Sequence, residues 1–121
     1  MKNYKKDDKL LVQFILKYCN QVEETIKRLE LDLDRLENDF LSQNALSMPI
    51  LQIGELIGSL SKDFFKKYNG LPWKEIIGIR HRMAHWYDVT DFEIIWIAAT
   101  ERIPEVKKYF EEILDELEKQ K

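Results

Sequence analysis

DDKLLVQFILKYCNQVEETIKRLE, the sequence of residues 7–30, repeats apolar side chains at intervals of three and four. These intervals place the side chains on one side of an α-helix, so the segment predicts a single long helix. Asp7 and Asp8 suit its first turn, where the helix dipole favours acidic side chains. The predicted apolar stripe consists of Leu10, Phe14, Val22, Ile26 and Leu29, with Leu11, Ile15 and Tyr18 beside it. Because so wide an apolar face needs other helices to cover it, the segment predicts a helical bundle.

The same kind of pattern continues to the C-terminus. Thr90 or Asp91 suits the N-cap of one of the later helices, and Pro104 should end or kink that helix near Arg102, because proline cannot donate a backbone hydrogen bond. The expected helices cover about 32–41 (beginning near Asp32 or Asp34), 44–68, 73–87, 91–102 and 104–117. We therefore expect an all-α fold, an antiparallel up-and-down bundle of four to six helices.

A second stripe, of small residues, runs along the helix expected over 44–68. Gly54, Gly58 and Ser61 form this stripe. Glycine inside a helix costs roughly 0.5–1 kcal/mol relative to alanine, so its presence needs a reason. The pattern predicts that another helix packs very close to these residues.

Length and composition favour one soluble domain. The 121 residues have room for a single domain over 1–121, and we expect 1–6 and 116–121 to fray. The net charge of −3 argues against a protein that coats nucleic acid through bulk charge. The single cysteine, Cys19, lies in an apolar pattern and is expected to be a small core residue. The sequence contains no apolar run long enough for a membrane span, so we expect a cytoplasmic protein that does not bind membranes.

The candidate functional stretch is Arg80-His81-Arg82-Met83-Ala84-His85-Trp86-Tyr87. Both histidines of the chain lie in it, four residues apart, so they project from one face of the expected helix. Arg80 falls on a stripe with Ile77 and Ala84, where the pattern calls for an apolar side chain. A half-buried guanidinium needs a carboxylate or a bound anion. Glu55 is the candidate for an internal ion-pair partner.

Two interpretations of this stretch stay open on the residues alone. In one, Arg80 and Glu55 form a structural ion pair and the histidines are ordinary surface residues. In the other, the permanent cations Arg80 and Arg82, together with His81, His85 and the phenol of Tyr87, form a site for a phosphodiester. A metal site is disfavoured because the residue after His81 is Arg82 rather than glutamate, and no third ligand is evident. Cys19 is disfavoured as a nucleophile because it lies on an apolar face of a distant helix.

The chain resembles the HepT-like family of HEPN-domain toxins. Arg80, four intervening residues, His85, one further residue and Tyr87 match the family's Arg-x4-His-x-Tyr signature. Two flanking segments, Leu51-Gln52-Ile53-Gly54-Glu55 and Leu71-Pro72-Trp73-Lys74-Glu75-Ile76-Ile77-Gly78-Ile79-Arg80, resemble the family's segments at those places, as do Val89, Trp96 and Pro104. One position departs from the pattern: the family most often has asparagine after the arginine, and this chain has His81.

The resemblance implies an all-α HEPN bundle that forms a homodimer, with the two signature helices meeting at a composite cleft. It implies a metal-independent endoribonuclease, with Arg80 and His85 as catalytic residues and no cofactor. The partner would be a minimal nucleotidyltransferase antitoxin that transfers AMP from ATP to Tyr87 and so blocks the site. His81 and Arg82 are second candidates, for proton transfer or for orienting the phosphate.

The expected mechanism is attack by the RNA's own 2′-hydroxyl, with His85 moving protons and Arg80 binding the scissile phosphate. Single-stranded or looped RNA is the expected substrate. A second hypothesis is a non-catalytic subunit that binds a nucleotide or substrate for a nucleotidyltransferase. A third is a dimeric scaffold in which Arg80 and Glu55 serve the structure alone.

Overall fold

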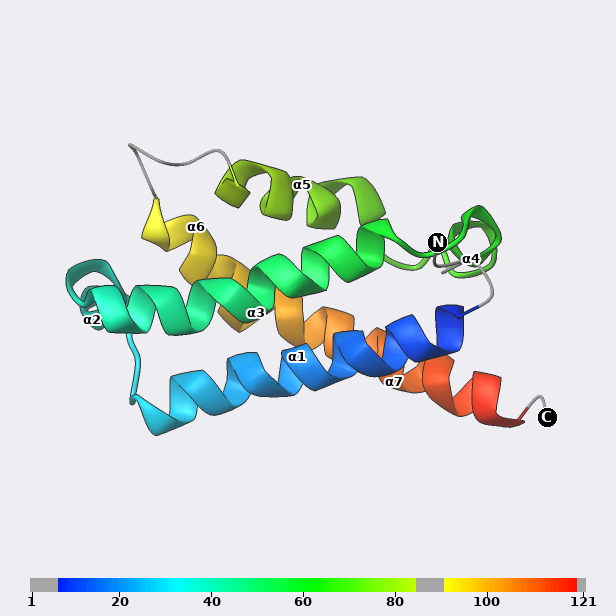
Figure 1. Ribbon diagram of the computed structural model, residues 1–121, viewed down its shortest axis with the longest axis horizontal. Coiled ribbons are helices and arrows are strands. Elements are labelled where there is room, and N and C mark those ends of the chain that lie inside the picture. The colour runs from blue at the N-terminus through cyan, green and yellow to red at the C-terminus, as the bar shows by residue number, and fades with distance from the viewer. Residues whose placement is uncertain (1–6, 85–90, 120–121) are drawn as a thin grey trace.

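The computed structural model describes residues 7–84 and 91–119, and over 79–84 it describes the helical backbone alone. Every regular element in this part of the chain is a helix, which confirms the predicted all-α bundle (Figure 1). The elements are α1 (Asp8–Arg28), α2 (Leu33–Asn38), α3 (Phe40–Gly58), α4 (Lys62–Lys67), α5 (Trp73–Ala84), α6 (Phe92–Ile97), the π-helical η2 (Ala98–Arg102) and α7 (Ile103–Lys119). Among the described residues, no helix combines the length and the hydropathy that crossing a membrane requires.

Helices α1 and α3 form the centre of the bundle. They run antiparallel and pack against each other, α7 packs against α1, and α5 packs along α3 (Figure 1). In Figure 1, α5 lies above α3 and α1 lies below it, so α3 separates these two helices. The largest buried side chains, to which α2 and α6 also contribute, are Phe110, Leu11, Ile15, Leu36, Leu46, Ile53, Ile57 and Ile95. Burying each such side chain contributes about 1.5–3 kcal/mol, so this core is the main source of stability.

The apolar stripe predicted on the first helix is wrong in part. Val22, Leu11 and Ile15 are buried as expected, but Leu10 and Phe14 are 44% and 41% exposed. The core face of α1 is centred on Val12, Ile15 and Cys19, which are all 0% exposed. Because the apolar face of α1 is wider than the surface that α3 and α7 cover, Leu10 and Phe14 are left at its margin.

The boundary predicted between the second and third helices is also wrong. Helix α2 ends at Asn38, and Leu41 belongs to α3 instead. Asp39 is the reason, because its side chain caps α3: one carboxylate oxygen accepts a hydrogen bond from the Leu41 backbone N–H (3.3 Å) and the other from the Ser42 hydroxyl (2.5 Å). Helix α3 therefore begins earlier than the expected residue 44.

The long helix expected over 44–68 is interrupted after Gly58, and α4 starts anew at Lys62. Ser61 caps α4, since its hydroxyl oxygen accepts a hydrogen bond from the Phe64 backbone N–H (3.1 Å). The backbone N–H and hydroxyl of Ser61 donate to the carboxylate of Asp8 at 3.0 and 2.6 Å. Ser61 is thus a capping residue rather than part of a small-residue stripe. A Cβ added at Gly58 would meet no atom within 4 Å, so the predicted close packing at that residue is wrong.

The C-terminal half confirms the expected effect of Pro104. Asp91 caps α6, with its carboxylate accepting from the Glu93 backbone N–H at 3.0 Å. The helix then widens into the π-helical turn η2, which ends at Arg102, and continues as α7. A wider turn removes the steric conflict between the Pro104 ring and the carbonyl four residues before it. Helix α7 continues to Lys119, and the fraying expected over 116–121 stays a prediction.

Helix α1 ends in a Schellman motif with an unusual residue at its turn. The Leu31 backbone N–H donates to the Ile26 carbonyl (3.0 Å), and the Glu30 N–H donates to the Lys27 carbonyl (3.3 Å). Glu30 has a positive φ of 49°, a conformation that glycine adopts more easily than a residue with a Cβ. We therefore expect Glu30→Gly to raise the free energy of unfolding by about 0.5–1 kcal/mol, as measured by urea denaturation.

A matched control for this prediction is Gln13→Gly, at an exposed position inside the same helix. That substitution should lower the free energy of unfolding by about 0.5–1 kcal/mol, because glycine weakens a helix interior. A loss of stability in both variants would contradict the prediction.

Candidate functional site

Helix α5, which carries the candidate stretch, is fixed at its first turn by aromatic side chains. The Trp73 indole N–H donates to the Tyr68 carbonyl at 2.7 Å. The Trp73 ring packs on Phe65 and Phe110, with centroids 5.4 and 5.6 Å apart. Phe110 in turn stacks on Phe64 at 5.9 Å. This cluster ties the start of α5 to α4 and α7.

The chain approaches α5 through Gly70, which passes close to α7. The Gly70 backbone N–H donates to the Tyr109 hydroxyl at 2.9 Å. A Cβ at this position would lie 2.8 Å from the Tyr109 ring, so the glycine is needed for this contact. The helix stop expected at Asn69-Gly70 lies two residues beyond the end of α4. The φ of Gly70 is not positive, so this glycine allows the chain to pass close to α7 rather than to adopt a left-handed turn.

An ion-pair network joins the first turn of α5 to η2. Arg102 contacts the carboxylate of Glu75 at 2.9 Å and that of Glu105 at 3.1 Å. The hydrogen bond to Glu105, followed by the charge of Glu75, raises the pKa of Arg102 above its ordinary value. All three side chains are partly exposed, so this network orients α5 more than it stabilises the fold.

The structure places three of the predicted site residues on the helical backbone of α5: Arg80, His81 and Arg82. The predicted helix is therefore confirmed as far as Ala84. The side chains of these three residues, and His85 and Tyr87 altogether, lie outside the described residues. The roles of all five stay predictions.

Glu55, the predicted partner of Arg80, lies on the part of α3 that faces α5. It is exposed and lines a small pocket of about 220 Å³ together with Gly54, Gly58, Ser59 and Ile77 of α5. Ile77 precedes Arg80 by three residues, and residues at that spacing lie on the same side of a helix. Glu55 therefore lies beside the side of α5 that contains Arg80. This placement agrees with the predicted ion pair, which itself stays a prediction.

An apolar hollow beside α5 was not predicted from the sequence. It has a volume of about 640 Å³ and is lined by Phe65, Pro72, Trp73, Lys74, Glu75 and Ile77. The signal available in the sequence was the pair Phe64-Phe65: when Phe64 enters the core, its neighbour must point elsewhere. Phe64 is 4% exposed, and Phe65 contributes to the wall of the hollow.

Cys19 has the properties predicted for a core residue. It is 0% exposed, and burial, with a smaller contribution from Glu23, raises the pKa of its thiol to about 12. A thiol that stays protonated at neutral pH is a poor nucleophile. Across 7–84 and 91–119, no three described His, Cys, Asp or Glu side chains gather as a metal site.

Comparison with known proteins gives a consistent result over almost the whole chain. The family model described as "Ribonuclease HepT-like" matches residues 15–113. The chain is 30% identical to "Putative RNase MJ1216" of Methanocaldococcus jannaschii, with 94% of this chain and 93% of the relative covered. It is 32% identical to "Putative RNase TTE0752" of Caldanaerobacter subterraneus, covering 85% and 90% of the two chains. It is 28% identical to "Probable ribonuclease HepT" of Thermococcus cleftensis, covering 79% and 92%. No solved structure matches this chain.

Proposed function

Because this chain belongs to the ribonuclease HepT-like family, we propose that it is a metal-independent endoribonuclease, the toxin of a toxin–antitoxin pair. One observation carries the proposal: the family match over residues 15–113 includes the whole Arg-x4-His-x-Tyr signature formed by Arg80, His85 and Tyr87. The names of relatives that align over most of their length support the ribonuclease part of the proposal.

The proposed reaction uses the 2′-hydroxyl of the RNA as its nucleophile. His85 removes the proton of this hydroxyl, whose oxygen attacks the adjacent phosphorus. The bond from phosphorus to the 5′ oxygen breaks, a proton is delivered to that oxygen, and the products are a 2′,3′-cyclic phosphate and a 5′-hydroxyl end. Arg80 binds the phosphate and stabilises the charge that develops on it. His81 supplies the second proton or, with Arg82, orients the phosphate.

A homodimer resolves two difficulties of this proposal. One copy of α5 supplies a single Arg80 and a single His85, and two copies facing one cleft double both groups. The chain has a net charge of −3, so RNA must be held by a local concentration of cations rather than by the whole surface. A cleft with two copies of Arg80, Arg82 and the two histidines would provide that local charge.

The proposed regulation is covalent modification of Tyr87 by a nucleotidyltransferase antitoxin. The phenol oxygen of Tyr87 attacks the α-phosphorus of ATP, the phenol proton is lost, and pyrophosphate leaves. The product is a phosphodiester between Tyr87 and AMP. A bulky, negatively charged nucleotide two residues from His85 would exclude an RNA phosphate from the site.

Arg80→Ala tests the proposal against a purely structural role. We expect cleavage of single-stranded RNA to fall by about 10²–10³-fold, because the variant lacks the group that binds the developing charge, with the unfolding midpoint unchanged. If Arg80 served only as the structural partner of Glu55, which is exposed, cleavage would be unchanged and the free energy of unfolding would fall by up to about 1 kcal/mol.

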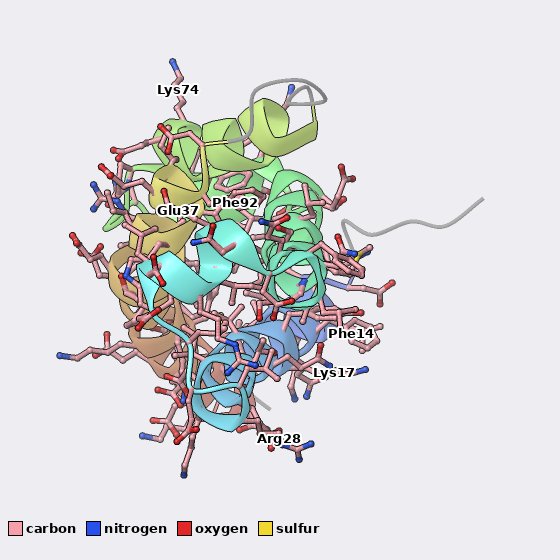
Figure 2. All side chains as sticks on the ribbon, turned by 90° about the vertical axis from the view of Figure 1, so that its left-hand side faces the viewer. Phe14, Lys17, Arg28, Glu37, Lys74 and Phe92 are labelled. Atoms are coloured by element: carbon pink, nitrogen blue, oxygen red, sulfur yellow. The ribbon has the colours of Figure 1, made fainter. Side chains whose placement is uncertain are left out.

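The control is Arg28→Ala. Arg28 is 75% exposed and pairs with Glu24, and Figure 2 shows it at the opposite end of the molecule from Lys74 of α5. This control should cleave as the wild type does. Unchanged cleavage by Arg80→Ala would contradict the proposal.

A further inference from the structure

The apolar hollow at the start of α5 is large enough to hold a ligand. Its volume of about 640 Å³ lies within the roughly 300–1,000 Å³ that is usual for small-molecule pockets. Phe65 of α4, with Trp73 and Ile77 of α5, forms apolar walls, and each of these side chains is partly exposed. The rings of Phe65 and Trp73 meet edge to face, with centroids 5.4 Å apart. The hollow therefore offers aromatic surface that the packing of the core leaves uncovered.

Lys74 places a positive charge at the rim of this hollow. The two charged residues in its lining are Lys74 and Glu75. Glu75 is held by Arg102 at 2.9 Å, whereas Lys74 forms no ion pair with any other residue of 7–84 and 91–119. Figure 2 shows Lys74 projecting outward from α5. The segment 62–75 contains four lysines and two acidic residues, a net charge of +2 in a chain whose net charge is −3. The hollow thus lies in a locally positive part of an acidic protein.

The hollow lies on the side of α5 that leads to Arg80 and His81. Trp73 and Ile77 precede Arg80 by seven and three residues. Lys74 precedes His81 by seven residues. Residues at these spacings lie on the same side of a helix, and α5 is helical over this whole stretch. At a rise of 1.5 Å per residue, the walls on α5 lie about 5–10 Å along the helix from the level of Arg80. A phosphate held by Arg80 would therefore have the hollow beside it.

We propose that this hollow is a subsite for one nucleobase of the RNA substrate, with the base against Phe65 and Trp73 and the adjoining phosphate at Lys74. The proposal deepens the proposed function, on which it rests: Arg80 binds the scissile phosphate, and the hollow receives a base to one side of it. A base that is paired within a duplex cannot enter the hollow, so the subsite selects single-stranded or looped RNA.

The combination of aromatic walls and a lysine favours a nucleobase over an apolar side chain of a protein partner. A base stacks on aromatic side chains, and it is attached to a backbone whose phosphates attract lysine. An apolar side chain would use the walls but would gain nothing from Lys74. Because the walls are apolar and every base has a flat face, the subsite should accept any unpaired base rather than read a sequence.

Replacing Phe65 with alanine tests the contact with the base. The probes are two strands of equal length and charge: an RNA with every 2′-hydroxyl methylated, which cannot undergo the proposed cleavage, and the same backbone without bases. Phe65→Ala should bind the RNA about 5–100-fold more weakly than the wild type does, the usual effect of losing one stacking ring, and should bind the base-free backbone equally well. Phe65→Tyr, which keeps a ring, should bind both strands as the wild type does. All proteins are first shown by mass spectrometry to be unmodified at Tyr87.

The matched control for this test is Phe14→Ala. Phe14 is a phenylalanine that is 41% exposed on α1, and Figure 2 shows it well away from Lys74. This variant should bind both strands as the wild type does. Wild-type affinity of Phe65→Ala for the RNA would overturn the proposal and leave the hollow to a protein partner. An equal loss for both strands would also overturn it, because such a loss does not depend on the bases.

The salt dependence of binding tests the contact between Lys74 and a phosphate. For single strands, each phosphate contact adds about 0.7 to the slope of log Kd against log salt concentration. Lys74→Ala should lower this slope by about that amount for both strands, since both contain the phosphate. Lys17→Ala, which removes an exposed lysine of α1, is the control and should leave the slope unchanged. An unchanged slope for Lys74→Ala would overturn the proposal, because the choice of a nucleobase depends on this contact.

Cleavage and binding together distinguish failure of the subsite from failure of the proposed function. If the wild type cleaves RNA in an Arg80-dependent way and Phe65→Ala binds RNA as tightly as the wild type, the subsite is overturned and the ribonuclease stays intact. If the wild type binds RNA through Phe65 but cleaves none, the base subsite is supported and the ribonuclease is contradicted.

Discussion

Replacing His85 with alanine should reduce cleavage of RNA by about 10²–10⁴-fold, the usual contribution of a positioned acid or base. The physical reason is that the 2′-hydroxyl is a weak nucleophile until its proton is removed, and His85 is the signature residue able to accept it near neutral pH. The measurement is the initial rate of cleavage of a single-stranded RNA across pH 5–9. In a plot of the initial rate against pH, the wild type should show a change of rate with pH that the variant lacks.

The control for this prediction is the other histidine. His81→Ala removes the imidazole four residues before His85 in the sequence, and the two variants together show which histidine is responsible for the pH dependence of the rate. Unfolding midpoints of both variants should match the wild type. If His81→Ala abolished cleavage and His85→Ala did not, the assigned roles would be reversed; if neither reduced it, the mechanism would be contradicted.

Phe110→Ala should have the largest effect on stability, a loss of about 3–5 kcal/mol in the free energy of unfolding. Phe110 is 0% exposed, and its ring packs against Phe64 of α4 and Trp73 of α5. Removing it leaves a cavity at the point where α7 holds the start of α5. Small domains have about 5–15 kcal/mol in total, so the variant should unfold at a much lower urea concentration.

The matched control is Phe40→Ala, because Phe40 is a phenylalanine that is 67% exposed. That substitution should change the free energy of unfolding by less than about 1 kcal/mol. All variants should be compared at one protein concentration, since dimer formation adds to the apparent stability. A loss below about 1.5 kcal/mol for Phe110→Ala would contradict the packing described for α4, α5 and α7.

The parts of the fold that were predictable from the sequence depend on local interactions. Asp32 caps α2 through the Arg35 backbone N–H at 2.8 Å, and Asp91 caps α6, both within three residues. Pro104 changes the helix geometry just before itself, at η2. In each case the residue that determines the structure lies within one turn of its effect, so the spacing in the sequence contains the necessary information.

The features that were not predicted depend on distant contacts. Helix α3 ends before α4 because Ser61 caps α4 and bonds to Asp8, which is 53 residues earlier in the chain. The start of α3 is an exception, because the Asp39 cap that assigns Leu41 to α3 joins residues only two apart and the spacing of Leu41 suits either helix. The apolar hollow beside Trp73 forms only when α4 packs on α5.

For the candidate site, the residue types could be read from the sequence, and the structure adds the position of α5 in the bundle. Arg80 could be assigned to a helix from its three-four spacing, and α5 confirms that assignment. Glu55 was singled out because it interrupts an apolar pattern, and its position beside Ile77 supports that choice.

The most direct test of the central claim is cleavage of a mixed single-stranded RNA pool by wild-type protein in EDTA, after mass spectrometry has shown Tyr87 to be unmodified. The account predicts cleavage in EDTA at the rate seen without it, with products that end in a 2′,3′-cyclic phosphate. Intact RNA under these conditions, or cleavage that requires a divalent cation, would contradict the claim that this chain is a metal-independent ribonuclease.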